Sequence, residues 1–126
     1  ADEWSSHEWL HFLRHLPELT SLERMEDLDK TFDFSNSKNS EIIAAWFVHV
    51  INNNYTVAYD RLEEFLVRVG RRKFLAPLYK TLAKTEANKK VGLMIYKKAR
   101  LNYHQISTVT IDGILGWEDV RYLMHD

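Results

Sequence analysis

The chain contains 126 residues with a mass of 15.0 kDa, which is the size of one domain with a single hydrophobic core. Hydrophobic residues make up 45% of it and charged residues 28%, a composition that excludes a disordered or fibrous protein. The formal net charge is −1, so the chain as a whole lacks the strong positive charge typical of nucleic-acid-binding proteins.

Cysteine is absent, which excludes disulfides and thiolate zinc sites and fits a reducing compartment. The longest apolar run covers residues 42–48 and is far too short to span a membrane, so no membrane partner is expected. No signal-peptide pattern is visible, and we therefore expect a cytoplasmic protein. The first residue is Ala1 rather than Met, which we interpret as a processed chain or a piece of a longer one.

Charged residues are segregated along the chain. Residues 1–60 hold 4 Lys or Arg against 11 Asp or Glu, residues 61–104 hold 12 against 3, and residues 105–126 hold 1 against 4. A basic middle section between acidic ones indicates either charge pairing within the fold or a positive face for an anionic partner.

Only 4 Gly and 2 Pro interrupt the chain, which favours long helices. The first predicted helix starts at Ser5 or Ser6, where Ser5 and Glu8 have the spacing of a capping box. A second box, Thr20 with Glu23, opens the next helix. Further helices are expected over residues 40–51, 55–69, 72–84, 88–101, 107–115 and, in the tail, 117–126.

The helix over residues 40–51 is expected to be the most buried, because its apolar side chains cover half of its circumference. Residues 109–111 (Val-Thr-Ile) have β-strand propensity, which works against the helix predicted around them. Successive helices joined by short turns predict an all-α fold with antiparallel neighbours. We expect one domain over residues 1–126, either a short α-solenoid of stacked helix pairs or a compact bundle.

Residues 7–11 read His-Glu-Trp-Leu-His, the H-E-x-x-H pattern in which zinc hydrolases place two imidazoles on one helix face beside a Glu. A catalytic zinc needs a third protein ligand. In the gluzincin pattern that ligand is a Glu 19 positions after the second His, and Lys30 stands there. We therefore interpret His7, Glu8 and His11 as a coincidental pattern, with Glu8 as a capping residue, and expect no metal site in the chain.

Four stretches of the sequence are distinctive: SSHEWLHFL, NSEIIAAWFVHVI, GRRKFLAPLYKTL and YHQIST. In order and spacing they resemble the C-terminal domain of the leukotriene A4 hydrolase family, which also includes aminopeptidases B and O. The likeness extends from about Trp4 to about Leu115, nearly the whole chain.

The resemblance implies a short right-handed α-α superhelix of armadillo or HEAT type, with about 7–8 helices, packed on a separate catalytic domain of the same parent protein. Members of this family are zinc metallopeptidases whose zinc lies in that catalytic domain. The chain alone is therefore expected to hold no cofactor and to be inactive. We recognise no counterpart in the family for the residues after Gly116, so the role of the tail at 117–126 stays open.

For the G-R-x-K-F stretch, the resemblance implies that Arg71 and Lys73 face the substrate cleft and receive the free carboxylate of a peptide substrate. A planar guanidinium can hold a carboxylate through two parallel hydrogen bonds, and an ammonium adds a point charge. The structural alternative for both residues is a solvated basic turn after a helix C-terminus, where cations complement the helix dipole.

Two other functions compete with this one. A protein-interaction scaffold with no active-site role would use the same helices, because a fold does not determine a function. An α-solenoid that binds nucleic acid or an acidic protein partner would use a stripe of cations. The residues available for that stripe are Arg68, Arg71, Arg72, Lys73, Lys80, Lys84, Lys89, Lys90, Lys97, Lys98 and Arg100.

Overall fold

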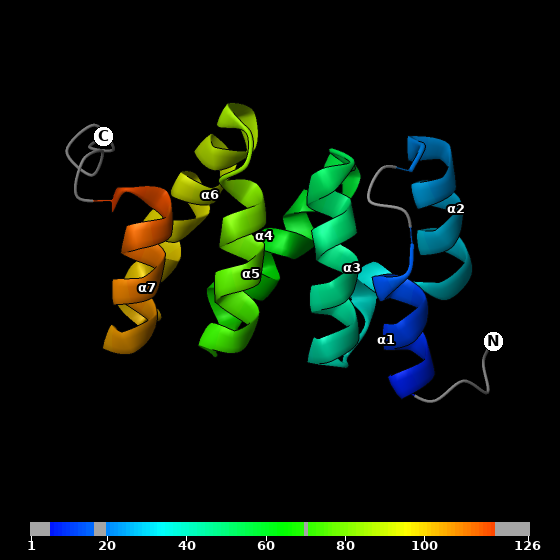
Figure 1. Cartoon of the computed structure of the whole chain (residues 1–126), viewed down its shortest axis with the longest axis horizontal. Coiled ribbons are helices and arrows are strands. Elements are labelled where there is room, and N and C mark those ends of the chain that lie inside the picture. The colour runs from blue at the N-terminus through cyan, green and yellow to red at the C-terminus, as the bar shows by residue number, and fades with distance from the viewer. Residues whose placement is uncertain (1–5, 17–19, 70, 118–126) are drawn as a thin grey trace. The chain divides into compact units, whose positions relative to one another are not determined.

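The computed structural model describes residues 6–16, 20–69 and 71–117, and every regular element in these ranges is a helix (Figure 1). The described ranges contain no β-strand, so the all-α prediction is confirmed. Three short 3-10 helices connect longer ones: η1 (Phe34–Asn36), η2 (Thr56–Ala58) and η3 (Arg100–Asn102). The α-helices are α1 (Ser6–Arg14), α2 (Leu22–Phe32), α3 (Ser40–Asn52), α4 (Tyr59–Arg68), α5 (Arg72–Leu82), α6 (Glu86–Ala99) and α7 (Gln105–Leu115).

Contacts within the chain divide it into two compact units, Ala1–Leu62 and Glu63–Asp126. The predicted single domain and right-handed superhelix depend on how these units are placed, and both stay predictions. The seven α-helices of the described residues agree with the number expected for them, while the eighth predicted helix begins at Trp117, the last described residue.

Four predicted helix starts are wrong. Two of these helices, α6 and α7, begin two residues earlier than predicted, because Thr85 and His104 cap them. The N-cap of α2 is Ser21, whose Oγ accepts a hydrogen bond from the Arg24 N–H at 3.1 Å. The backbone N–H of Thr20, the predicted cap, instead donates to Asn53 Oδ1 at 2.6 Å. The fourth predicted helix also begins later than expected, because the single 3-10 turn η2 precedes α4.

The first unit is built around α3, which has seven buried residues, more than any other described helix. Its prediction as the most buried helix is confirmed. The Trp46 indole N–H donates to Ser35 Oγ at 3.0 Å, so the largest core side chain has its polar group satisfied. A hydrogen bond between His49 Nε2 and Leu13 O ties α3 to α1, which packs beside it.

The second unit packs α5 against both α6 and α7. The three helices meet at Gly92 of α6, where an added Cβ would lie 3.4 Å from Leu82 Cβ and 3.6 Å from Leu115 Cδ2. A methyl group at Gly92 would therefore make ordinary van der Waals contacts with α5 and α7.

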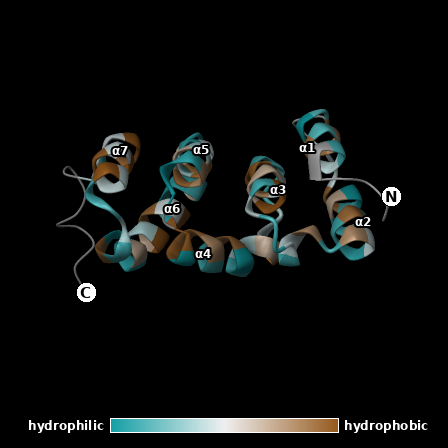
Figure 2. Cartoon of the chain, turned by 90° about the horizontal axis from the view of Figure 1, so that it is seen from below, coloured by the Kyte–Doolittle hydropathy of each residue, from teal (hydrophilic) through white to brown (hydrophobic). Residues whose placement is uncertain are grey.

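Along α2 and α4, Figure 2 shows both hydrophobic and hydrophilic residues, the pattern of helices with one buried and one solvated side.

The stretch with β-strand propensity, residues 109–111, lies within α7. Ile111 is fully buried in the second unit, so tertiary packing outweighs the local preference. The helix ends at Gly116, whose φ of 64° is the left-handed conformation usual after a helix. The next residue, Trp117, packs edge-on against Tyr96 with ring centroids 5.1 Å apart.

Candidate functional site

Three consecutive cations stand at the beginning of α5. Arg71 is the N-cap residue, Arg72 and Lys73 open the helix, and all three side chains are exposed. The Arg71 side chain makes no capping hydrogen bond, and no acidic residue lies in the first turn. The N-terminal end of a helix carries a positive partial charge, so cations are unfavourable there and anions are favoured. The structural alternative, a solvated basic turn after the C-terminus of the preceding helix α4 at Arg68, stays a prediction beside carboxylate binding.

Buried neighbours hold this helix end in place. Phe74 and Leu75 are buried, and the Phe74 ring meets the Phe65 ring at 6.3 Å between centroids. The Lys73 ammonium lies 5.2 Å from the centroid of the Phe74 ring, within the range of a cation–π interaction. The cations are thus exposed groups on a backbone that the core of the second unit fixes.

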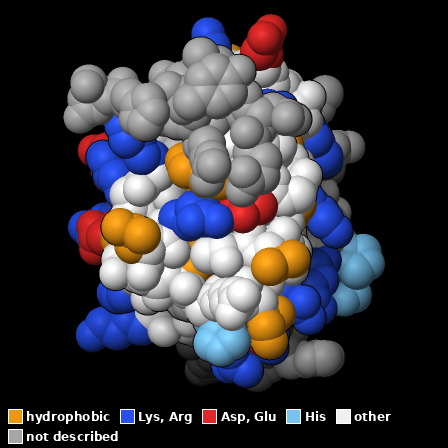
Figure 3. All heavy atoms as spheres, turned by 90° about the vertical axis from the view of Figure 1, so that its left-hand side faces the viewer, with side chains coloured by type: hydrophobic (Ala, Val, Ile, Leu, Met, Phe, Trp, Pro, Cys, Tyr) orange, Lys and Arg blue, Asp and Glu red, His pale blue; other side chains and the backbone are white. Residues whose placement is uncertain are grey.

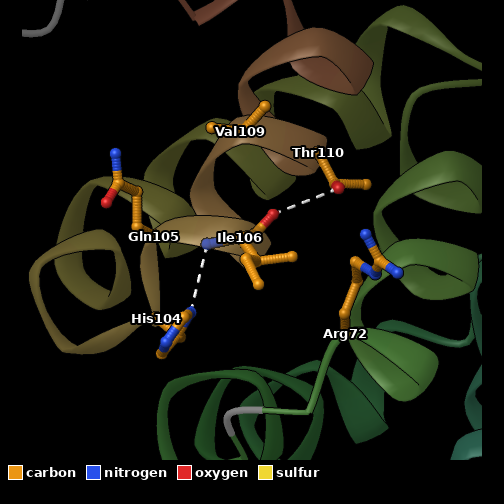
Figure 4. A pocket seen from close by; sticks show the side chains of 6 residues that line it. All are labelled: Arg72, His104, Gln105, Ile106, Val109 and Thr110. Atoms are coloured by element: carbon orange, nitrogen blue, oxygen red, sulfur yellow. Dashed lines mark hydrogen bonds between the residues drawn. The ribbon is translucent and has the colours of Figure 1, made fainter.

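A pocket of about 330 Å³ lies between the beginnings of α5 and α7 (Figure 4). We call it the Arg72 pocket. Ile106 and Val109 bring apolar surface to it and remain 57% and 67% exposed. No acidic side chain lines it among the described residues. Its lining consists of Arg72, His104, Gln105, Ile106, Val109 and Thr110.

Two polar groups of the Arg72 pocket are engaged with the backbone of α7 (dashed lines in Figure 4). The Ile106 N–H donates to His104 Nδ1 at 3.2 Å, which makes His104 the N-cap of the helix. The Thr110 hydroxyl donates to Ile106 O, also at 3.2 Å. The sequence led to Arg71 and Lys73 but not to this pocket. The apolar residues Ile106 and Val109, three positions apart in α7, were the signal available in the sequence. That they lie near Arg72 is evident only in the folded structure.

The H-E-x-x-H stretch lies in α1. Glu8 and His11 are exposed, and the side chain of His7 lies outside the part that can be described. The His11 ring packs on the His15 ring, with the ring centroids 4.1 Å apart, and His15 Nδ1 donates a hydrogen bond to His11 O at 2.8 Å. Within the described residues, no three His, Asp or Glu side chains gather in a way that could hold a metal ion. The pairing of His11 with His15 was not predicted from the sequence.

Part of the basic middle section is neutralised within the second unit. Lys98 Nζ lies 3.2 Å from Glu63 Oε2, and Arg100 forms two hydrogen bonds to Asp112, at 3.0 and 2.8 Å. Hydrogen bonding to Asp112 raises the pKa of Arg100 above its ordinary value. Internal charge pairing, one of the two explanations for the segregated charges, thus accounts for these cations.

A network of tyrosines gives the second unit its internal polar contacts. Tyr103 OH donates to Leu66 O, so Tyr79 OH is the donor in its 3.0 Å hydrogen bond with Tyr103 OH. Tyr96 OH donates to Asp112, the carboxylate that also holds Arg100. These residues are engaged in hydrogen bonds within the second unit and do not line the Arg72 pocket, and no pattern in the sequence singles them out.

The first unit contains a larger hollow of about 500 Å³ beside the rings of Trp9, Phe32 and Phe34. These rings pack against one another, with centroid distances of 4.9 Å from Trp9 to Phe32 and 5.3 Å from Trp9 to Phe34. Phe34 is buried and Trp9 and Phe32 are half-buried, so these rings form the margin of the aromatic core of the first unit.

None of the helices in the described ranges has the length and apolar character needed to cross a bilayer.

The chain is similar to several fungal aminopeptidases. It is 30% identical to a leucine aminopeptidase 2 of Neurospora crassa over 116 residues, which cover 90% of this chain and 17% of that protein. The corresponding protein of Pyricularia oryzae is 27% identical over 94% of this chain and 20% of its own length. That of Chaetomium globosum is 28% identical over 92% of this chain and 19% of its own length. The chain therefore spans about a fifth of the length of these relatives.

A family profile matches residues 4–115, a range that covers most of both units and includes the first turn of α5. The profile is described as leukotriene A4 hydrolase, C-terminal. This range agrees with the extent of the resemblance found in the sequence, and its end coincides with the end of α7. The chain accordingly belongs to the leukotriene A4 hydrolase C-terminal domain family, within the wider group of aminopeptidases.

Proposed function

We propose that this chain is the non-catalytic C-terminal domain of a zinc aminopeptidase, that it packs on the catalytic domain, and that it lines the substrate cleft. Arg71 and Lys73 hold the free carboxylate of the peptide substrate. Family membership and the relatives named aminopeptidase support the first part. The zinc ion, which activates water for peptide hydrolysis when bound, belongs to the catalytic domain.

The observation that carries the carboxylate role is the position of the cations. Arg71 and Lys73 lie in the first turn of a helix, where the dipole opposes positive charge, and both are exposed. A carboxylate placed there would receive charge-assisted hydrogen bonds from the side chains and a favourable interaction with the helix end. The local arrangement is therefore more favourable with an anion than without one.

An anchor at the end of the substrate acts on the reaction through position. A peptide held by its carboxylate has its scissile bond at a fixed distance from the anchor, which reduces the entropy lost on reaching the transition state. Arg71 suits this role because its guanidinium can engage both carboxylate oxygens, which fixes orientation as well as distance. Lys73 adds charge without that directional constraint.

The test uses the full-length parent enzyme with the substitution Arg71→Ala. We expect kcat/KM for peptides with a free C-terminus to fall about 10- to 100-fold, the equivalent of losing one hydrogen bond to a charged group. The same peptides with an amidated C-terminus should be hydrolysed by both enzymes at similar rates. Arg71 makes no capping bond, so α5 should remain intact, which circular dichroism would check.

Lys80→Ala is a matched control, because Lys80 is an exposed cation in the last turn of the same helix. Its kcat/KM should equal that of the wild type for both kinds of peptide. Equal losses on free and amidated peptides in the Arg71 variant would show that Arg71 supports structure and does not recognise the carboxylate.

Binding of nucleic acid or of an acidic protein is the second candidate. It is favoured by the many exposed cations of the second unit, among them Lys80, Lys90 and Lys97. It is weakened by the pairing of Lys98 with Glu63 and of Arg100 with Asp112, which removes two cations from the stripe.

A further inference from the structure

The Arg72 pocket opens next to the residues assigned to the substrate carboxylate. We infer that it receives an aliphatic side chain, that of the substrate residue which carries the free carboxylate. This inference rests on the proposed function and adds a preference to it: peptides that end in Leu, Ile or Val should be better substrates. Arg71 and Lys73 would recognise the carboxylate, and the pocket would recognise the side chain beside it.

The apolar lining of the pocket identifies the kind of group that fits. Ile106 and Val109 are three residues apart on α7, so their side chains lie on the same side of the helix. Both keep more than half of their surface exposed, and Figure 3 shows hydrophobic side chains exposed among Lys and Arg on the side of α7. Covering these two side chains with an aliphatic group would remove apolar surface from water on both partners, which favours binding.

The size of the pocket limits what can enter. Its volume of about 330 Å³ is at the small end of the range of about 300–1,000 Å³ found for ligand pockets. A single side chain suits this volume better than a longer stretch of peptide does. The polar groups of His104 and Thr110 are engaged with the backbone of α7, so the wall they form has a fixed geometry.

The charges around the pocket indicate that the aliphatic group belongs to a ligand that also carries a negative charge. Arg72 lines it directly, between Arg71 and Lys73 in the sequence, and no acidic side chain lines it among the described residues. Adjacent Cα atoms are about 3.8 Å apart, so the backbone of the two proposed carboxylate ligands is directly next to that of Arg72, which lines the pocket. A substrate ending in Lys or Arg would bring a cation toward Arg72 and should be disfavoured.

The experiment measures kcat/KM of the full-length parent enzyme on tripeptides that differ only in their last residue. The series ends in Gly, Leu or Lys, each with a free carboxylate and as the amide. We expect the wild type to prefer Leu over Gly by about tenfold or more, as apolar pockets discriminate, and to be slowest on Lys. Equal rates on the Leu and Gly peptides would overturn the inference.

Ile106→Asn and Val109→Asn test the pocket itself. Both positions are exposed in the described structure, so the fold should tolerate the change. Each variant should reduce the preference for Leu over Gly to within about twofold and leave the preference for free over amidated peptides unchanged. Met94→Asn is the matched control, because Met94 is 54% exposed on α6 and does not line the pocket, and it should keep the wild-type preference.

The two proposals fail in different measurements. If the Ile106 and Val109 variants retain the Leu preference, the pocket does not receive the side chain, and the carboxylate role of Arg71 is unaffected. If Arg71→Ala leaves the preference for free over amidated peptides intact, the carboxylate role fails. Loss of activity on every peptide in both the pocket variants and the control would indicate altered domain packing and would also overturn the side-chain assignment.

Discussion

Tyr103 connects three parts of the second unit at the scale of a single residue. Its hydroxyl donates to Leu66 O in α4 and accepts from Tyr79 of α5, while its own backbone follows η3. Burial raises the pKa of Tyr103 to about 12, although the hydrogen bond with Tyr79 opposes that change. Burial also raises the pKa values of Tyr79 and Tyr96 above the ordinary value. Ionisation of these side chains therefore opposes folding.

We expect the free energy of unfolding to fall as the pH rises from about 10 toward 12. Unfolded tyrosine ionises near its ordinary pKa of about 10, whereas folded Tyr103 keeps its proton until about pH 12. In this window the folded state binds more protons than the unfolded state, so raising the pH favours unfolding. Urea unfolding at about pH 9, 10 and 11 measures the slope. A decline just as steep in Tyr103→Phe would contradict the role assigned to this residue.

At the scale of the helix, capping and packing decide where a helix begins and which helices form a pocket, and residue propensity alone does not. The sequence located every described α-helix, because apolar spacing and the low glycine count are strong signals. It missed the start of α2 by one residue, since Thr20 and Ser21 are both competent caps and only the contact with Asn53 distinguishes them. It could not reveal the Arg72 pocket, because that site joins side chains from two helices that are distant in the sequence.

Two glycines in helices should respond oppositely to substitution. Gly113 of α7 is exposed and an added Cβ meets no heavy atom within 4 Å, so Gly113→Ala should raise the free energy of unfolding by about 0.5–1 kcal/mol. Gly92→Leu should lower it by about 1–3 kcal/mol, because the larger side chain would collide with Leu82 and Leu115. Denaturant unfolding of both variants checks the pair. Destabilisation by Gly113→Ala would mean that α7 differs from the helix described.

At the scale of the whole molecule, the charges argue for a confined anion site. The net charge of −1 gives no general attraction to polyanions, and two cations of the basic section are paired within the second unit. The cations at the start of α5 are exposed at a helix end whose dipole does not favour positive charge. The proposed recognition of a single carboxylate needs only these cations, whereas binding along a nucleic-acid backbone would need a continuous stripe of them.

We expect a labelled single-stranded oligonucleotide not to saturate the chain at micromolar protein concentrations, because the net charge of −1 gives no general attraction to a polyanion and Lys98 and Arg100 are paired with carboxylates. Fluorescence anisotropy at about 50 and 200 mM salt is the measurement. A protein that neutralises 6–10 phosphates loses about 10³–10⁵ in affinity between these salt concentrations. Tight binding with such a salt dependence would favour the nucleic-acid candidate over the peptidase domain.

The packed core of the second unit extends past the end of α7 to Trp117. The family match finishes at residue 115, yet the indole two positions later covers Tyr96 and lies 5.8 Å from the Arg100 guanidinium. A truncation after residue 115 would remove the Trp117 indole from the Tyr96–Asp112–Arg100 cluster and expose that cluster to water. Trp117, two residues beyond the end of the family match, therefore belongs to the core of the second unit.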